Sequence, residues 1–327
     1  VLTRAPTADV VITAVAPTDP ITGSPQLAVN NGSGGSTLTF TPANWDAAQT
    51  FTVTAMEDDV VEGLFSAAIS HTAAGGVYQG IAISSLAVAV TDNDSPAVQI
   101  TQSGGATAVA EGAASGSAGY SDDYDVVLLT RPYFPVTITA TPDSQVAVTS
   151  AAGSSRLTFT SDNYNIPQRL TVRAIDDAVV EGTYSGTARL PHQGVINHAA
   201  GGSGFSKASV GPVNVGVTDN DQPIVIIIET GGTTQVAENG ATDTYDVVLG
   251  RQPSGDVTIT ATPFTDPNAD PETQLSVAKG GANTLTFTPT DWNVCQTLTV
   301  SALQDDVIEG LHVSSITHAA AGGSYDG

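Results

Sequence analysis

Short windows in which apolar and polar residues alternate run along the whole chain. Residues 37–41 read Thr-Leu-Thr-Phe-Thr, and residues 257–262 read Val-Thr-Ile-Thr-Ala-Thr. A period of two puts the apolar side chains on one face and the threonines on the other, as in an antiparallel strand with one buried face. No long window has apolar residues at the i, i+3, i+4, i+7 spacing of an amphipathic helix. The pattern therefore predicts an all-β protein.

The chain also repeats its own sequence. The stretch at 38–63 (LTFTPANWDAAQTFTVTAMEDDVVEG) returns in related form at 157–182 and at 285–310. Roughly 120 to 130 residues separate successive copies, which is too long for one unit of a solenoid. The period fits three copies of a whole β-sandwich domain, with short strands and frequent turn signals.

The sequence Val-Thr-Asp-Asn-Asp, at 90–94 and 217–221, closes the first two copies. A two-residue link follows each, Ser95-Pro96 or Gln222-Pro223. Proline fixes its own φ and favours an extended residue before it, so these links do not behave as flexible Gly/Ser linkers. We predict tandem antiparallel, immunoglobulin-like β-sandwich domains arranged end to end, at residues 1–95, 96–222 and 223–327.

Only the middle copy is expected to be complete. Residues 10–17 match 136–142, so the first domain lacks its opening strands; residues 318–327 match 71–80, so the third lacks its closing strand. The sequence therefore predicts a piece of a longer polypeptide.

Acidic residues recur in three elements: a lone Glu in an opening strand, Asp-Asp-x-x-Glu-Gly after a later strand, and Asp-x-Asp after the closing strand. The middle copy has one extra residue between the Asp pair and the Glu. If the two loops share one tip of the sandwich, five or six carboxylates meet there. The candidate ligands are Asp58, Asp59, Glu62, Asp92, Asp94, Glu111, Asp176, Asp177, Glu181, Asp219, Asp221, Glu238, Asp305, Asp306 and Glu309.

Calcium is the cation that such a cluster suits best. Carboxylates packed together repel one another strongly when they are partly buried. Ca²⁺ accepts six to eight oxygen ligands, whereas Mg²⁺ prefers a small octahedron with several waters and Zn²⁺ prefers His or Cys among its ligands. Asp, Asn and Gly are also ordinary turn residues, so one element alone is more often a solvated turn. Three elements that recur together favour metal binding.

These elements resemble the Calx-β domain family. The resemblance rests on an Ala-x-x-Asp-type acidic loop ending in Glu-Gly and on a later Val-Thr-Asp-Asn-Asp, and it covers all three copies. It implies calcium-binding β-sandwiches, of the kind found in sodium–calcium exchangers, in an integrin cytoplasmic tail and in tandem arrays of large bacterial surface proteins. The low lysine content favours the bacterial arrays. The resemblance to the family also implies that calcium binds at the acidic residues named above, although the third copy has no closing Asp-x-Asp.

Charge and composition exclude several other functions. The chain has 9 basic and 33 acidic residues and a net charge of −24, so it has no basic patch for nucleic acid. An anionic membrane surface would repel it, and no apolar run is long enough for direct membrane insertion. A single cysteine excludes an internal disulfide framework. We find no Ser-His-Asp order and no phosphate-binding loop, so we do not expect an enzyme.

Two classes of function remain. The first is a calcium-stiffened structural rod in a secreted or surface protein, such as an adhesin stalk or an extracellular filament building block. Its partners would be further repeats of the same polypeptide, other copies in a filament, or other surface proteins. The second is a calcium-sensing or carbohydrate-binding module of a larger enzyme or transporter. Tandem copies with two-residue links favour the rod.

Overall fold

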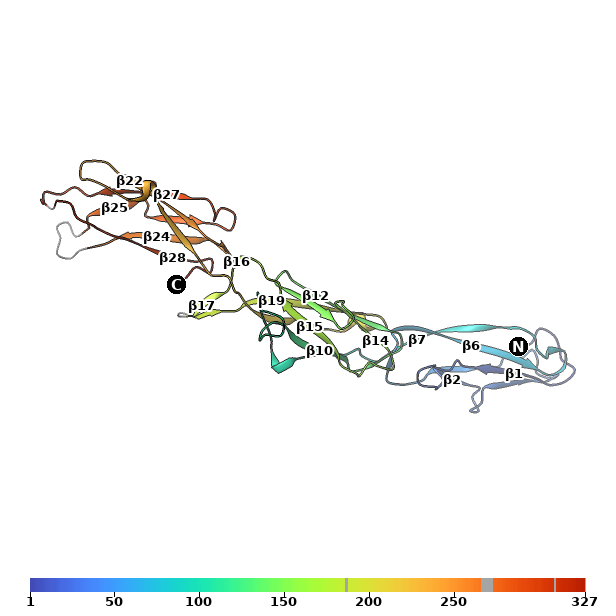
Figure 1. The fold of residues 1–327 in the computed structure, drawn as a ribbon. Helices are drawn as coiled ribbons and strands as arrows, with labels where there is room; N and C mark the ends of the chain where they lie inside the picture. Colours follow the sequence, from blue (N-terminus) through green and yellow to red (C-terminus); the bar gives the residue numbers. More distant parts are fainter. Residues whose placement is uncertain (186–187, 266–272, 309, 327) are drawn as a thin grey trace.

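The computed structural model describes residues 1–185, 188–265, 273–308 and 310–326. The molecule is elongated, with its early strands at one end and its late strands at the other (Figure 1). We divide the strands into a first group (β1–β7), a second group (β8–β20) and a third group (β21–β28). The described residues contain no α-helix, only the short 3₁₀ turns Gly76–Tyr78, Ser103–Gly105, Phe205–Lys207 and Thr230–Gly232. The prediction of an all-β protein is confirmed.

The first group forms one four-stranded sheet, in the order β3-β1-β6-β7, and a two-stranded sheet of β2 and β4. All pairings in these two sheets are antiparallel. Its strands are β1 (Val10–Val15), β2 (Leu27–Asn30), β3 (Thr37–Phe40), β4 (Thr52–Ala55), β5 (Val60–Val61), β6 (Leu64–Ala74) and β7 (Ile83–Thr91).

The second group has two larger sheets, β13-β15-β10-β8 and β14-β12-β19-β20-β9. Within the second sheet, β9 runs parallel to β20, and the other pairings are antiparallel. The strands are β8 (Val98–Gln102), β9 (Thr107–Ala110), β10 (Asp122–Leu128), β11 (Arg131–Pro132), β12 (Val136–Pro142), β13 (Val146–Ser150), β14 (Arg156–Phe159), β15 (Gln168–Ala174), β16 (Val179–Val180), β17 (Thr183–Ser185), β18 (Ala188–Leu190), β19 (His192–Gly201) and β20 (Val213–Thr218).

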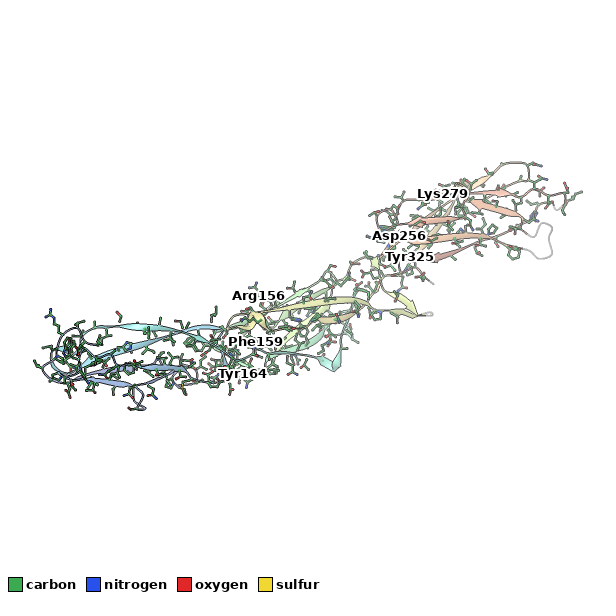
Figure 2. The ribbon with its side chains drawn as sticks, turned by 180° about the vertical axis from the view of Figure 1, so that it is seen from behind. Arg156, Phe159, Tyr164, Asp256, Lys279 and Tyr325 are labelled. Carbon is green, nitrogen blue, oxygen red and sulfur yellow. The ribbon has the colours of Figure 1, made fainter. Side chains whose placement is uncertain are left out.

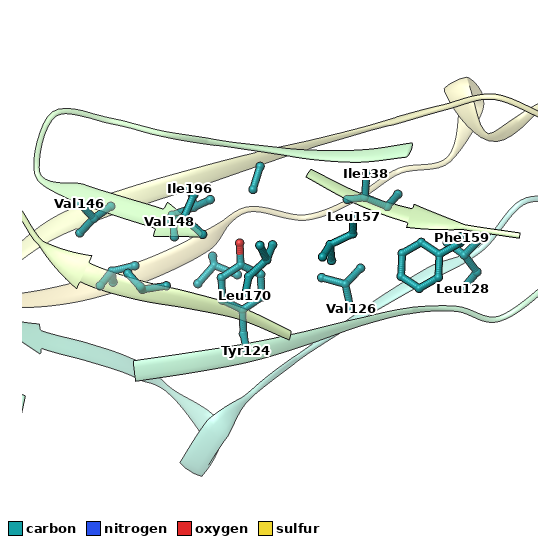
Figure 3. Packing of buried hydrophobic residues seen from close by; sticks show 14 of the residues in the cluster. Tyr124, Val126, Leu128, Ile138, Val146, Val148, Leu157, Phe159, Leu170 and Ile196 are labelled. Atoms are coloured by element: carbon teal, nitrogen blue, oxygen red, sulfur yellow. The ribbon is translucent and has the colours of Figure 1, made fainter. Parts of the chain in front are cut away.

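The two sheets of the second group face each other across a buried core (Figure 3). Tyr124 and Leu170 come from one sheet, Ile138 and Phe159 from the other, and all four are almost fully buried. Strict alternation produces this arrangement, because in β12 the Val, Ile and Ala positions are buried while the threonines between them are less so. The packing is that of a β-sandwich.

The third group consists of the sheets β21-β22-β27-β25 and β26-β24-β28. Its core contains the counterparts of the second group's core residues, including Tyr245, Ile259 and Phe287. The strands are β21 (Val225–Glu229), β22 (Asp243–Leu249), β23 (Gln252–Pro253), β24 (Val257–Pro263), β25 (Leu275–Ala278), β26 (Thr284–Phe287), β27 (Gln296–Ala302) and β28 (Ile316–Ala321).

Two short parallel pairings connect the groups. β5 of the first group pairs with β11 of the second, and β16 of the second pairs with β23 of the third. Figure 2 shows Phe159 and Tyr164 at the end of the second group that faces the first, and Tyr325 at the end of the third that faces the second. Each junction therefore joins the loop that contains β5 or β16 to a short strand of the following group.

Candidate metal centre

The acidic cluster of the second group lies where β9 and β20 end side by side. The parallel pairing of these strands continues beyond them, because the backbone N–H of Glu111 donates to the carbonyl of Thr218 at 2.9 Å. Glu111 therefore lies next to Asp219 and Asp221, which follow β20. The Asp219 carboxylate accepts hydrogen bonds from the N–H of Glu181 at 2.5 Å and from the N–H of Asp221 at 2.6 Å. One side chain thus ties the closing strand to the Asp-Asp…Glu loop.

Glu111 is the clearest sign that this cluster could hold a cation. Its carboxylate is buried, and neither oxygen has a hydrogen-bond partner. The nearest basic atom is Nε2 of His192, 3.8 Å away. Burial, together with the charges of Asp219, Asp177, Glu181 and Asp176, raises the pKa of Glu111 to about 8. A buried carboxylate without a donor is costly, and a bound cation would remove that cost.

The oxygen atoms of the cluster are close enough to share an ion. One oxygen each from Glu111, Asp219 and Asp221 lies within 4.8 Å of the others, and so do ligand atoms of Glu111, Glu181 and His192. The first set offers only carboxylate oxygens, which suit a hard cation such as Ca²⁺. The donor set therefore fits calcium.

Neighbouring side chains hold this second-group cluster in place. Gln145 donates from Nε2 to Oε1 of Glu181 at 3.0 Å, and Nε2 of His192 lies 3.1 Å from Oε2 of Glu181. Arg251, from the third group, lies 3.2 Å from Oδ1 of Asp221. Burial raises the pKa of Asp221, and the Arg251 charge opposes that rise.

The first group has a related cluster built partly from different residues. Ligand atoms of Asp19, Asp58 and Glu62 lie within 4.8 Å of one another. Asp92 accepts hydrogen bonds from the N–H groups of Glu62 at 2.8 Å and Asp94 at 2.8 Å, as Asp219 does in the second group. Burial and the Asp58 charge raise the pKa of Glu62 to about 7, while the Gln26 amide opposes that rise. Burial and the Asp92 charge also raise the pKa of Asp94.

The structure shows how the acidic loops of the first two copies correspond. The loop of the middle copy is not one residue longer, because Asp58 and Asp177 each accept a hydrogen bond from the N–H two residues on, that of Val60 or Val179. The Asp pair is instead displaced by one position. Ala178 thus replaces the exposed Asp59, and the exposed Asp176 corresponds to a Glu in the first group.

That Glu, Glu57, was not among the predicted ligands. It accepts a hydrogen bond from Nδ2 of Asn93 at 2.8 Å, and Asp176 accepts the same bond from Asn220 at 3.1 Å. The middle residue of Asp-Asn-Asp therefore anchors the loop in both groups.

In the third group, the described residues do not form such a cluster. Glu238 is exposed and lies outside any strand, and Asp306 is exposed as well. Asp305 keeps the loop geometry, since its Oδ1 accepts a hydrogen bond from the N–H of Val307 at 2.7 Å. Glu309 lies outside the described residues.

Several site residues could not be identified from the acidic motifs. Gln26, Gln145 and Gln274 occupy one repeated position just before a strand, which the internal repeats would have indicated. Asp19 lies in a loop where its carboxylate accepts bonds from Ile21 N–H and the Thr22 hydroxyl, and His192 begins a strand. Neither carries a sequence signal of metal binding.

The fold and the clusters define an all-β protein with carboxylates gathered at the ends of its first two strand groups. No protein family and no curated protein matches the chain. One similar solved structure is a protein of unknown function from Porphyromonas gingivalis, with 9% identity, a TM-score of 0.19, and coverage of 62% of this chain and 81% of that one.

Two further solved structures are similar at the same level. The CsuC–CsuE chaperone–tip adhesion subunit complex of Acinetobacter baumannii has 8% identity and a TM-score of 0.22, covering 68% of this chain and 99% of that one. The native E. coli alpha-2-macroglobulin has 8% identity and a TM-score of 0.19, covering 98% and 22%. Likenesses this low carry no argument about function. Within the described part of the chain, no helix has the length and hydropathy needed to cross a membrane.

Replacing Asp219 by Asn should weaken calcium binding in the second group, because Asp219 both faces Glu111 and holds the Glu181 loop. Calorimetric titration of the full chain with calcium measures the effect. Asp162→Asn is the matched control, since Asp162 is an exposed acid outside the cluster. Asp143 suits this purpose less well, because it accepts backbone hydrogen bonds from Gln145 and Val195. Equal losses from both substitutions would mean that calcium binds only through diffuse charge.

The calcium-free protein should lose stability as the pH rises from 5 to 8.5. Glu111 keeps its proton in the folded state up to a pKa of about 8, whereas the unfolded chain releases it near 4.5. The folded state thus binds more protons in this window, and the free energy of unfolding falls as pH rises. Urea denaturation in EDTA at several pH values, compared with Glu111→Gln, isolates this contribution. A parent protein that gains stability relative to the variant would contradict the assignment.

Proposed function

We propose that this protein is a calcium-stabilised structural segment of an extracellular or cell-surface protein. In this proposal residues 1–95, 96–222 and 223–327 are tandem Calx-β-like sandwiches, and calcium bound at the tip of one stiffens its joint with the next. The elongated arrangement of the strand groups supports a rod (Figure 1).

One observation carries the proposal: the loop that presents the acids is also the joint. In the first group, β5 lies between Asp58 and Glu62, and it pairs in parallel with β11 of the second group. In the second group, β16 lies between Asp177 and Glu181 and pairs in the same way with β23 of the third. An ion that fixes these acids would fix the pairing strand between them.

The contacts around each pairing are close and similar. The carbonyl of Val61 accepts the N–H of Tyr133 at 3.0 Å, and the carbonyl of Val180 accepts the N–H of Ser254 at 3.2 Å. At the first joint the hydroxyl of Ser203 also donates to the Val61 carbonyl. At the second, the hydroxyl of Ser324 donates to the carbonyl of Gly182. Each acidic loop is thereby bonded to the following group.

Gly63 shows how closely the two groups approach. Its φ is +75°, and a Cβ at this position would lie 3.0 Å from the backbone nitrogen of Gly204 in the second group. Only glycine combines this left-handed conformation with backbone-to-backbone contact. The Glu-Gly pair thus combines a candidate ligand with the residue that lets the next group dock.

Electrostatic interactions also act between the groups at each joint. Burial raises the pKa of Tyr133 in the second group, and the charges of Asp19 and Glu62 in the first group raise it further. Arg251 of the third group supplies the cation nearest to Asp221 in the second. Without a metal ion, repulsion among the acids would loosen the same loop that holds the next group.

Calcium should raise the thermal unfolding midpoint of the full chain. An ion that binds only the native state adds about 2.7 kcal/mol at a hundredfold excess over its Kd. Melting followed by circular dichroism, in EDTA and then in millimolar calcium, measures this change. Magnesium at the same concentration is the control for ionic strength. A midpoint that does not move with calcium would refute calcium binding.

Small-angle scattering tests the rod and its joints. We expect an extended particle in calcium and a broader range of bend angles in EDTA. Ser203→Ala removes a joint hydrogen bond without removing an acidic side chain, so it should loosen the particle in calcium. A compact particle in calcium, or scattering that is the same with and without the ion, would argue against the stiffened rod.

A further inference from the structure

The third group leaves one side of its core open. A groove of about 1080 Å³ runs along it, lined by apolar side chains that include Ile227, Val236, Leu275, Val300 and Ile316. Beside it, Leu311 and Val313 are almost fully exposed, at 104% and 96%. Among the described strands, β28 pairs only with β24, so its other edge faces this groove.

In the second group, a strand occupies the position that corresponds to this groove. There, β20 lies between β19 and β9, antiparallel to the first and parallel to the second. Val213, Val215 and Val217 of β20 point inward and are at most 1% exposed. They lie opposite Ile196, Gly194 and His192 of β19. These three positions correspond to Ile316, Ser314 and His312 in the third group, because His198 and His318 occupy the same register position on their sheets.

The third group also has the other wall of the groove, the counterpart of β9. The N–H of Gln235 donates to Oδ2 of Asp243 at 2.7 Å, as the N–H of Ala108 in β9 donates to Oδ2 of Asp122 at 2.9 Å. The segment Thr-Gln-Val-Ala at 234–237 is thus held where Thr-Ala-Val-Ala of β9 is held. Val236, like Val109, packs against the core of its group.

We infer that this groove is a docking site for one β-strand of the β20 type, with Val or Ile at alternate positions. The incoming strand would run antiparallel to residues 312–316 and parallel to residues 234–237. Its backbone would pair with residues 312–316, which lead up to the start of β28 at Ile316, and its three apolar side chains would cover the exposed core. Charge favours a neutral or metal-loaded strand, since Glu238 lines the groove and corresponds to Glu111, beside which Asp219 and Asp221 lie in the second group.

A peptide-binding experiment on the unaltered full chain tests this inference. The probe is a fluorescent peptide with the sequence of residues 211–221, in which Asp219 and Asp221 are both replaced by Asn. These replacements remove the metal ligands, so the result does not depend on the proposed calcium function. A second peptide also carries Val215→Asp, and a third carries Asn214→Asp. The two added charges are equal but lie on opposite faces of the strand.

The probe and the Asn214→Asp peptide should bind, whereas the Val215→Asp peptide should bind about tenfold more weakly or worse, because its charge would enter the apolar groove. Hydrogen exchange should show new protection at residues 312–316 when the probe is added. Absence of binding, or equal binding of the probe and the Val215→Asp peptide, would overturn the inference. Protection of these residues without peptide in a dimeric chain would also overturn it, since a second copy would then fill the groove.

Discussion

The structure depends on one electrostatic constraint: carboxylates are gathered at loop ends in a chain with very few cations. Nine basic residues face 33 acids, so most acidic side chains have no protein counter-ion. Backbone N–H groups stabilise some of these carboxylates: Asp92 and Asp219 each accept a hydrogen bond from the neighbouring loop. Glu111 lies beyond the reach of those donors, which leaves a buried carboxylate whose charge the fold itself does not balance. An oxygen-binding cation is the natural balance.

This constraint also decides where the groups touch. The two valines between the acids pair with the next group, so any force that spreads the acids also pulls on the joint. Because the pairing strands are only two residues long, they contribute little stability by themselves. In the function proposed above, the rigidity of the joint would depend on the order of the surrounding loop, and that order on how well the acids are neutralised.

The strands could be predicted because alternation is a local pattern. The sequence also suggested that the acidic motifs meet at one tip, and the structure brings several of them together in the first two groups but not among the described residues of the third. Alternation sets which side chains face the core, and the Asp-Asn-Asp turn carries its own hydrogen bonds. The roles of Asp19, His192 and Arg251 could not be predicted in the same way. They reach the clusters from loops and strands distant in the sequence, and one of them comes from the next group. The Asp pair lies one residue farther from the Glu in the middle loop because Asp176 occupies the position of Glu57.

Within the described part of the chain, the contacts at each joint come from the two adjoining groups. Tyr133 and Ser254 make the same backbone bond to Val61 and Val180, so this part of the junction recurs at both joints. A genetic duplication or deletion of one whole repeat would leave every remaining junction with a matching partner on each side. Recombination between repeats can thus change the length of such a protein in steps of one domain without creating a new interface.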